Sequence, residues 1–400
     1  MQESKFYWHI HNGEYAIVSY PLQGISILLP HGKRILSNIE EGIYTQLSSL
    51  DYQLIDFPEA VPSEFTDHLI KRYLFETKNL KRSFFLSGSC EMQSAYTAKH
   101  LVYSYRDMPL KFYSKTTVHR ENNTSAMIKD IEYTSFELNA FFASMKEAIS
   151  EKEDVNKIIA NQLQILEIPF ISVNQLQDQN GPTVFYVFFP FSESFGSVFW
   201  SSVVGVKYTQ ALDFQFRNSA DKIIHPIQFN AGFTSRILAA YLANHSDEQG
   251  FLLQPHISPA DVLISKEPGQ KYDSIRFRKK AITSKGYRTL KSKFLSMGIP
   301  IMLYQGQHEI NVTYRRSLDS EWVRPENLDD NLYQYLNNQQ GNTAQLGPIV
   351  ICATDNFSDQ TNKKIIYKVP FNKEQEWING GMKKLGYLDP NNLAFVAKKY

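Results

Sequence analysis

The chain has 400 residues, of which 42% are hydrophobic, and its net charge is +1. This size and composition are sufficient for two or three domains with real cores. The near-neutral charge excludes a strongly basic nucleic-acid-binding surface over the whole protein, so any RNA contact has to come from a local patch. The two cysteines exclude a disulfide framework and a four-cysteine zinc site.

The ends and the hydropathy of the chain suggest where the protein works. The N-terminus has no apolar run behind a basic start, and no later window is long and uncharged enough to span a bilayer. We therefore expect a cytoplasmic protein by default. Changes in composition along the chain predict three domains, at residues 1–254, 257–340 and 341–400.

The first of these domains combines short apolar runs with longer amphipathic segments. Phe185–Phe191 is predicted to be a buried strand. Apolar residues at helical spacing predict a helix over Thr134–Ile149 and another over Ser235–His245, with Thr234 as the cap of the second helix. Both helices are expected to pack on a sheet.

The two later domains contain strand-like and helix-like pieces in alternation. Residues 257–340 run from a strand at Asp261–Ile264 through a basic helix to strands at Ile299–Tyr304 and Val312–Tyr314, and then to a polar helix. This order predicts a small α/β unit. The tail carries the stretches Ile349–Cys352 and Lys364–Phe371 and is therefore expected to be ordered, after a loop at residues 341–345.

One motif points to chemistry more directly than any other. The stretch Gln228-Phe-Asn-Ala-Gly-Phe-Thr-Ser-Arg236 places an arginine at the start of a helix, behind a glycine. An arginine in this position can hold phosphate oxygens through two parallel hydrogen bonds. The motif therefore suggests an ATP site.

This stretch closely resembles the third signature motif of class II aminoacyl-tRNA synthetases, specifically of the archaeal and eukaryotic type of prolyl enzyme. Further stretches resemble the same family over nearly the whole chain. They are Gln23–Gly32 with Pro30, Ser87–Glu91, His119-Arg120, Asp130–Tyr133, Met297–Ile301 and Tyr314-Arg315-Arg316. The final Tyr400 repeats the family's terminal tyrosine.

The resemblance implies an α+β fold: a class II antiparallel sheet flanked by helices, then a small α/β anticodon-binding-like domain and a short C-terminal α/β tail. It also implies a homodimer formed through the first motif. The family's C-terminal zinc cysteines are absent from this chain. We therefore expect no zinc and no other protein-bound structural metal.

The resemblance assigns candidate residues to an ATP site in which Mg²⁺ bridges the phosphates. Arg120 would hold the α-phosphate and Arg236 the far end of the triphosphate, and both would be catalytic. The other candidate ATP contacts are Glu132, Tyr133, Gln228 and Thr234. Either arginine alone would more commonly be a structural ion-pair partner, and Glu132 could equally order its neighbours.

The resemblance also implies an amino-acid pocket, in which Ser89 and Glu91 would face the substrate ammonium or imino group. The remaining candidates for this pocket are Glu137, Asn139, Trp200 and Ser202. Glu91 could instead cap or bridge. Cys90 is expected to be a buried thiol rather than a nucleophile.

Several positions depart from the family pattern. Ser87, Asn122, Ile131 and Ser197 replace charged or amide residues, which reduces the charge around ATP. In the amino-acid pocket, Ser135 replaces a tryptophan, Asn139 replaces a histidine, and residues 199–203 replace a Gly-Thr-Ser-His-His run. Such a pocket is not expected to hold proline well, because apolar walls and paired polar contacts supply its selectivity.

A basic run in the second domain is the densest positive patch of the sequence. Its candidate RNA contacts are Arg276, Arg278, Lys279 and Lys280. Interleaved aromatic residues would stack on unpaired bases. The run could equally be the solvated face of an ordinary helix.

Two functions are therefore considered. The protein either activates an amino or imino acid as an adenylate and passes it to tRNA, a carrier protein or a small acceptor, or it is an inactive paralogue that acts as a tRNA-binding, regulatory or interaction protein. The pair Arg120 and Arg236 favours the enzyme, and the reduced charge around ATP favours the paralogue.

Overall fold

The structure is a computed structural model. It describes residues 1–65, 75–77, 83–121, 126–175, 182–192, 194–265, 278–282, 286–305, 309–338 and four strands of the tail. The predicted loop at residues 341–345, together with Asn122 and Tyr400, lies outside these residues.

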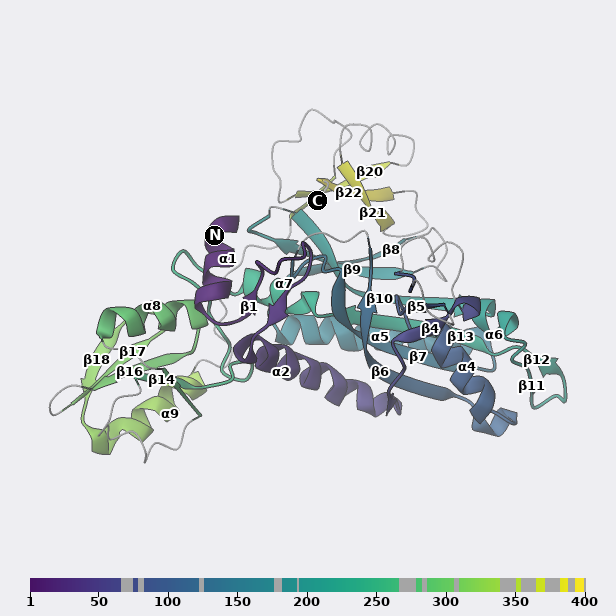
Figure 1. Ribbon diagram of the computed structural model, residues 1–400, viewed down its shortest axis with the longest axis horizontal. Coiled ribbons are helices and arrows are strands. Elements are labelled where there is room, and N and C mark those ends of the chain that lie inside the picture. Colours follow the sequence, from purple (N-terminus) through teal and green to yellow (C-terminus); the bar gives the residue numbers. More distant parts are fainter. Residues whose placement is uncertain are drawn as a thin grey trace.

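An eleven-stranded sheet forms the centre of the molecule (Figure 1). Its strands are antiparallel except for the pairs β19/β20 and β3/β6, which are parallel. In spatial order they are β19 (Val350–Ala353), β20 (Ile365–Pro370), β22 (Leu393–Lys398), β21 (Met382–Tyr387), β8 (Phe170–Asn174), β9 (Thr183–Phe189), β10 (Ser194–Gly205), β13 (Ile227–Thr234), β7 (Glu132–Phe142), β6 (Leu110–His119) and β3 (Gln53–Ile55).

Three helices cover one face of this sheet. α5 (Met145–Ile165) packs on β10, β13 and β7, and α2 (Pro30–Leu47) packs on α5 and on α7 (Arg236–Asn244). α2 starts with proline at its first turn and buries an i, i+4 stripe that includes Ile35, Ile39 and Ile43. This face holds the main hydrophobic core.

The opposite face is covered at one end by α4 (Glu91–Leu101) and α6 (Lys207–Ala211). Small residues of α4, Ala95 and Ala98, pack there with Phe112 and Phe141 of the sheet. Short strand pairs lie at the same end, namely β4 (Ala60–Pro62) with β5 (Phe84–Leu86) and β11 (Phe216–Arg217) with β12 (Ile223–Ile224). Next to this end, the same face of the sheet carries the polar residues described below.

A mixed five-stranded sheet with α8 (Tyr287–Met297) and α9 (Leu328–Asn338) lies at the other end of the molecule, on the left of Figure 1. Its strand order is β15 (Lys279–Ile282), β14 (Val262–Ser265), β16 (Ile301–Gln305), β17 (Ile310–Tyr314) and β18 (Ser320–Val323). α1 (Glu3–Asn12) packs on α8, and β1 (Ala16–Ile17) pairs with β2 (Ile27–Leu28). The predicted α/β pattern of residues 257–340 is therefore present.

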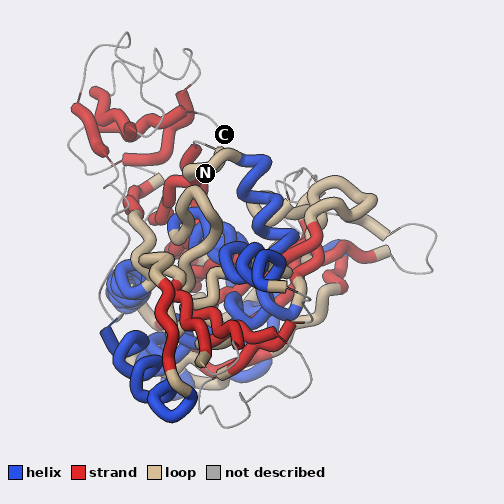
Figure 2. Tube along the Cα trace, turned by 90° about the vertical axis from the view of Figure 1, so that its left-hand side faces the viewer, coloured by secondary structure: helices blue, strands red, loops and turns tan. Residues whose placement is uncertain are grey.

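The four tail strands extend the main sheet rather than standing apart from it. The link is between β21 and β8, where Tyr387 is opposite Asn174. Figure 2 shows these strands as a projecting group at the upper left. The two stretches that predict an ordered tail coincide largely with β19 and β20.

Two helix predictions need correction. Residues 132–142 form β7 rather than the start of a helix, and the helix begins at Met145 with Ser144 as its N-cap. Phe136, Leu138 and Ala140 of β7 all belong to the core on one face, which is strand periodicity. The helix behind the glycine motif begins at Arg236 with Ser235 as its N-cap, although the Thr234 hydroxyl accepts a hydrogen bond from Arg236 N.

Candidate active site

Polar side chains gather on one face of four neighbouring strands, β6, β7, β13 and β10. Residues directly opposite each other in an antiparallel pair project to the same face. The register places Ser114 opposite Glu137, Glu137 opposite Gly232, and Gly232 opposite Trp200. Two residues along, Asn139 is opposite Asn230, which is opposite Ser202. Residues from four strands thus form one polar surface, which we call the polar face.

One end of the polar face lies at Gln228, and we call it the inner end. Gln228 connects the sheet to the first turn of α4 there. Its Nε2 donates to the Glu91 carbonyl at 3.0 Å, to Ser94 Oγ at 3.1 Å and to Asn139 Oδ1 at 3.1 Å. One nitrogen therefore brings Glu91 and Asn139 together. The sequence assigned Gln228 to the ATP site, but its contacts are with residues assigned to the amino-acid pocket.

Glu137 lies at the centre of the polar face and is buried. Its Oε1 accepts from Ser135 Oγ at 2.9 Å, and its Oε2 accepts from the Cys90 backbone N–H at 3.1 Å. Burial and the nearby Glu91 charge raise the pKa of Glu137, whereas these hydrogen bonds and the Arg120 charge lower it, and the net shift is upward. The site thus contains two carboxylates, Glu137 and Glu91, and an arginine, Arg120, whose charge acts on Glu137.

Trp200 forms the wall beside Glu137. Its indole lies so close to Gly232 that a Cβ added there would be 2.9 Å from Trp200 Cζ2. Trp200 Nε1 donates to Asn230 Oδ1 at 2.9 Å, which fixes the ring. The glycine of the motif therefore permits close approach of a side chain to the strand, without a positive φ.

The opposite end of the polar face, which we call the outer end, contains residues that the sequence assigns to the ATP site. Tyr133, Thr234 and Arg236 line one small cavity together with Asp130. The cavity volume there is about 10 Å³, which is far below the roughly 300 Å³ of a typical ligand pocket. Arg120 follows β6, and its backbone N–H donates to the Ile131 carbonyl at 2.7 Å.

Internal acceptors hold the guanidinium of Arg236. Nη1 donates to the Ser197 carbonyl at 2.7 Å and to Ser197 Oγ at 3.0 Å, and Nε donates to the Ile128 carbonyl. The side chain thus braces β10 against the 126–131 segment. Binding of a triphosphate by Arg236 would require part of this set to be exchanged for phosphate oxygens.

Two further candidates lie at the margins. Glu132 is next to Tyr133 on β7 and therefore projects to the opposite face, where its half-exposed carboxylate is 3.2 Å from His119 Nε2. Ser89 is partly exposed in the loop before α4, where its carbonyl accepts from Ser87 Oγ at 3.1 Å. The structure brings neither side chain into the hydrogen-bonded group around Glu137.

The Cys90 thiol is buried and has a structural role. It lies just before α4, and burial raises the pKa of the thiol well above its usual value. The thiol therefore stays protonated and unreactive at neutral pH. Its backbone N–H is the functional group here, because it orients the Glu137 carboxylate.

The basic run does not form one continuous helix, because Lys279 and Lys280 lie in the strand β15. The Arg278 guanidinium binds the Asp261 carboxylate at 2.6 Å and the carbonyls of Ser258 and Pro255, each at 2.8 Å. Lys280 pairs with Glu14 at 3.4 Å. These contacts favour structural roles for Arg278 and Lys280, while Lys279 is exposed. Arg276 lies outside the described residues.

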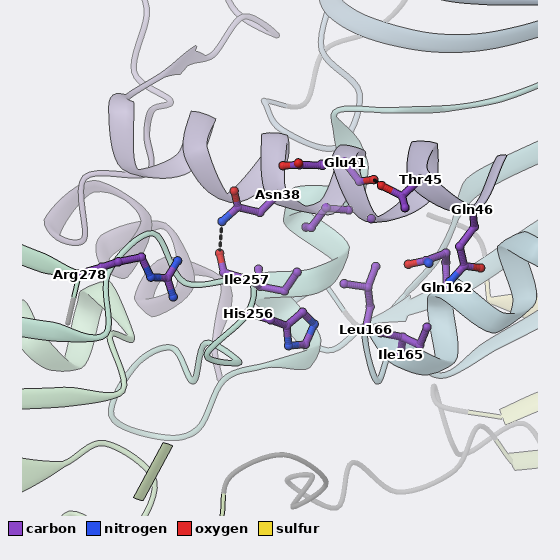
Figure 3. A pocket seen from close by; sticks show the side chains of 12 residues that line it. Asn38, Glu41, Thr45, Gln46, Gln162, Ile165, Leu166, His256, Ile257 and Arg278 are labelled. Carbon is purple, nitrogen blue, oxygen red and sulfur yellow. Dashed lines mark hydrogen bonds between the residues drawn. The ribbon is translucent and has the colours of Figure 1, made fainter. Parts of the chain in front are cut away.

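A separate cavity of about 440 Å³ is lined by α2, by α5 with the adjoining Leu166, and by His256, Ile257 and Arg278 (Figure 3). Asn38 Nδ2 donates to the Ile257 carbonyl across it at 2.9 Å. Of the candidate residues named from the sequence, only Arg278 lines it. This cavity is on the helix-covered side of the sheet, away from the polar face.

Sequence reasoning assigned no role to two side chains that hold the site together, although it placed Ser135 in the amino-acid pocket. Asn230 binds Trp200 Nε1 and donates to Asn139 Oδ1 at 3.3 Å, and Ser135 donates to Glu137. Asn230 is two residues from Gln228, so strand periodicity within the motif would have placed both on one face. Ser135 is two residues from Glu137 and follows from the same argument.

Comparisons with known proteins show what the central part of the chain is similar to. Residues 73–245 match the family model of the tRNA synthetase class II core domain (G, H, P, S and T). This part of the chain is therefore similar to the core of class II aminoacyl-tRNA synthetases.

The relatives narrow the resemblance within that class. Proline–tRNA ligase of Aeropyrum pernix is 24% identical over 65% of this chain and 57% of its own length, and that of Sulfolobus acidocaldarius is 23% identical over 81% and 76%. The chain therefore spans less than two thirds of the length of the first of these. Within the class, the chain is prolyl-tRNA synthetase-like.

Solved structures bear out the fold predicted from the sequence. Giardia lamblia prolyl-tRNA synthetase in complex with prolyl-adenylate matches with a TM-score of 0.85 and 18% identity, over 99% of this chain and 98% of that chain. The Cryptosporidium parvum enzyme with L-proline and AMP also gives 0.85, at 16% identity, over 100% and 95%. The class II sheet flanked by helices is thereby confirmed. In the part of the chain that the structure describes, no helix is long and apolar enough to cross a membrane.

Proposed function

We propose that the protein activates an amino or imino acid other than proline as an aminoacyl adenylate, using ATP, and transfers it to tRNA or another acceptor. One observation carries this proposal: a single sheet face joins a Tyr133–Arg236 end to a Glu91–Gln228 end, with Glu137 between them. The two ends suit a nucleotide and an amino acid bound in line.

The chemistry requires the substrate carboxylate to attack the α-phosphorus of ATP, with pyrophosphate leaving. Arg120 follows the last residue of β6, on the side from which its charge acts on Glu137. It would neutralise the α-phosphate and the carboxylate as they approach. Glu91 would receive the substrate ammonium at the other end.

Mg²⁺ fits this site only as an ion held chiefly by phosphates. Glu132 is the one carboxylate in the predicted ATP set, and it projects to the opposite face of the sheet, half exposed beside His119. An octahedral Mg²⁺ commonly uses one or two carboxylates together with substrate phosphates and water. When bound, the ion would reduce the charge of the phosphates.

The wider assignments are part of the proposal. Residues 1–254 would be the catalytic domain, residues 257–340 an anticodon-binding-like domain and residues 341–400 a tail without zinc, in a cytoplasmic homodimer. The names of the relatives and the mixed sheet with α8 and α9 support this assignment. Lys279 is the exposed candidate for RNA contact.

The decisive experiment is amino-acid-dependent ATP–pyrophosphate exchange with the purified protein, across a panel that includes proline as the reference. We expect exchange with at least one acid and weak or no exchange with proline. If no acid supports exchange and calorimetry detects no ATP binding, the catalytic proposal is wrong.

Replacing Arg236 by alanine should weaken ATP binding at least tenfold, because the guanidinium carries the charge at the outer end of the site. It should also lower the free energy of unfolding by about 1–3 kcal/mol, because the Ile128 and Ser197 carbonyls lose their partner. Calorimetry with ATP and urea denaturation measure the two effects.

The control for Arg236→Ala is Arg217→Ala, which removes an exposed arginine paired with Asp221 on a distant strand. This variant should match the wild type in both measurements. Unchanged ATP affinity in a folded Arg236→Ala protein would make Arg236 purely structural.

The internal bonds of Arg236 also favour a second function, an inactive synthetase-like protein that binds tRNA or a regulatory partner. In that case Arg236 serves only to brace β10, through Ser197 and Ile128. ATP binding separates the two functions, because the inactive protein should bind none.

A further inference from the structure

The polar face contains two amide groups whose orientation is fixed by their neighbours. Asn139 Oδ1 accepts from Gln228 Nε2 at 3.1 Å and from Asn230 Nδ2 at 3.3 Å. Gln228 Nε2 is occupied by three acceptors. Because the oxygen of one amide and the nitrogen of the other are both occupied, neither side chain can be flipped without losing these bonds.

This arrangement leaves one free donor and one free acceptor, on two side chains that are hydrogen-bonded to each other. Asn139 Nδ2 and Gln228 Oε1 are buried and have no hydrogen-bond partner among the described residues. Both side chains are 2% exposed or less. A buried polar group without a partner costs about 1–3 kcal/mol, so the two atoms point to a ligand that satisfies both.

A third free atom lies nearby, at the end of α4. Glu91 Oε2 has no partner among the described residues, and the Glu91 carbonyl shares the Gln228 amide with Asn139. Glu91, Trp200 and Ser202 are partly exposed, while Asn139, Gln228 and Asn230 are buried. The partly exposed residues adjoin the buried amides, because Glu91 contacts Gln228 and Trp200 contacts Asn230.

The required ligand follows from the donors and acceptors. A substrate ammonium can donate to Glu91 Oε2. A side-chain hydroxyl can donate to Gln228 Oε1 and accept from Asn139 Nδ2, and a carboxamide can do the same. A second ammonium can only donate, which leaves Asn139 Nδ2 unpaired, and an apolar ring satisfies neither atom.

We propose that the substrate of this site is an amino or imino acid whose side chain carries a hydroxyl or a carboxamide. This inference rests on the proposed function and specifies its substrate class. The burial of the amide pair makes the discrimination strong, because sites built to bind a hydroxyl reject analogues that lack it by as much as about 10⁴-fold.

The test uses matched pairs of acids in ATP–pyrophosphate exchange: serine with alanine, threonine with valine, hydroxyproline with proline, and asparagine with leucine. In at least one pair we expect the hydroxyl or carboxamide acid to be preferred at least 100-fold in kcat/KM. Faster exchange with the apolar members would overturn the inference while leaving the adenylating activity established.

A binding measurement separates the substrate class from the activity. Seryl-, threonyl-, asparaginyl-, hydroxyprolyl-, alanyl- and prolyl-sulfamoyladenosine mimic the adenylates without reacting. Tighter binding of a hydroxyl or carboxamide analogue than of both alanyl and prolyl analogues supports the inference even if no exchange occurs. Equal binding, tighter binding of the apolar analogues, or binding of none overturns it.

Asn139→Asp provides the sharpest variant, because it exchanges the free donor for an acceptor without changing the size of the side chain. The preference should shift towards an ammonium side chain, so that the ratio of 2,3-diaminopropionate to serine rises at least tenfold. Asn218→Asp, in the turn between β11 and β12, is the matched control and should leave the ratio unchanged. If Asn139→Asp is folded by its melting curve and keeps the wild-type ratio, Asn139 does not contact the side chain.

Discussion

Arg315→Ala is expected to lower the free energy of unfolding by about 3 kcal/mol, which is the largest stability effect anticipated for this protein. Arg315 is 1% exposed, and its two terminal nitrogens bind the two Asp247 oxygens at 2.9 Å each. Truncation would leave a half-buried carboxylate without its cation. The expected loss of stability is at the lower end of the range for buried ion pairs, because 35% of the Asp247 side chain is exposed to solvent.

The ion pair connects two parts of the fold, since Arg315 follows β17 and Asp247 follows α7. Urea denaturation followed by tryptophan fluorescence measures the effect. Arg217→Ala removes a pair that is exposed on both sides, so it should cost no more than about 0.5 kcal/mol. Equal stability of the two variants would show that the buried pair adds nothing.

The same pair has a pH signature. Burial raises the pKa of Asp247, but the hydrogen bonds and charge of Arg315 outweigh burial, and the net pKa lies below the ordinary 3.8. A depressed folded-state pKa contributes stability that is present above pH 3.8 and is lost as the pH falls through the folded value. Arg315→Ala should therefore reduce the loss of stability below about pH 4.

Arg120→Ala is expected to reduce amino-acid-dependent ATP–pyrophosphate exchange by about 10²–10³-fold. The reason is electrostatic, because the charge of Arg120 acts on the buried Glu137 and would neutralise charge that develops at the α-phosphate. No hydrogen bond from its guanidinium is recorded among the described residues, so truncation should leave the melting temperature within about 2 °C.

The contrast with Arg236 gives this prediction a control within the site. Arg236 is tied to Ser197 and Ile128, so Arg236→Ala should lose stability, whereas Arg120→Ala should lose turnover alone. Exchange by Arg120→Ala at more than about one tenth of the wild-type rate would remove Arg120 from the proposed catalytic set.

The strands and helices with a clear pattern could be predicted from the sequence. The α/β pattern of residues 257–340 and order in the tail can be predicted from the sequence, and the fold class follows from the motifs. β7 was misread as a helix because it is buried on both faces, so that its apolar residues do not alternate cleanly with exposed ones. Its register with β6 and β13 resolves the ambiguity.

By itself, the sequence determined which chemical groups the polar face contains, because Arg120, Glu137 and the stretch from Gln228 to Arg236 are fixed in type and spacing. Only the tertiary structure decided which of their atoms are free. Arg236 is occupied by carbonyls 39 and 108 residues away in the chain, and the Gln228 amide is occupied by residues 89–137 positions away. Hydrogen bonds saturate specific atoms across such separations, and no local pattern records which atoms are left unpaired.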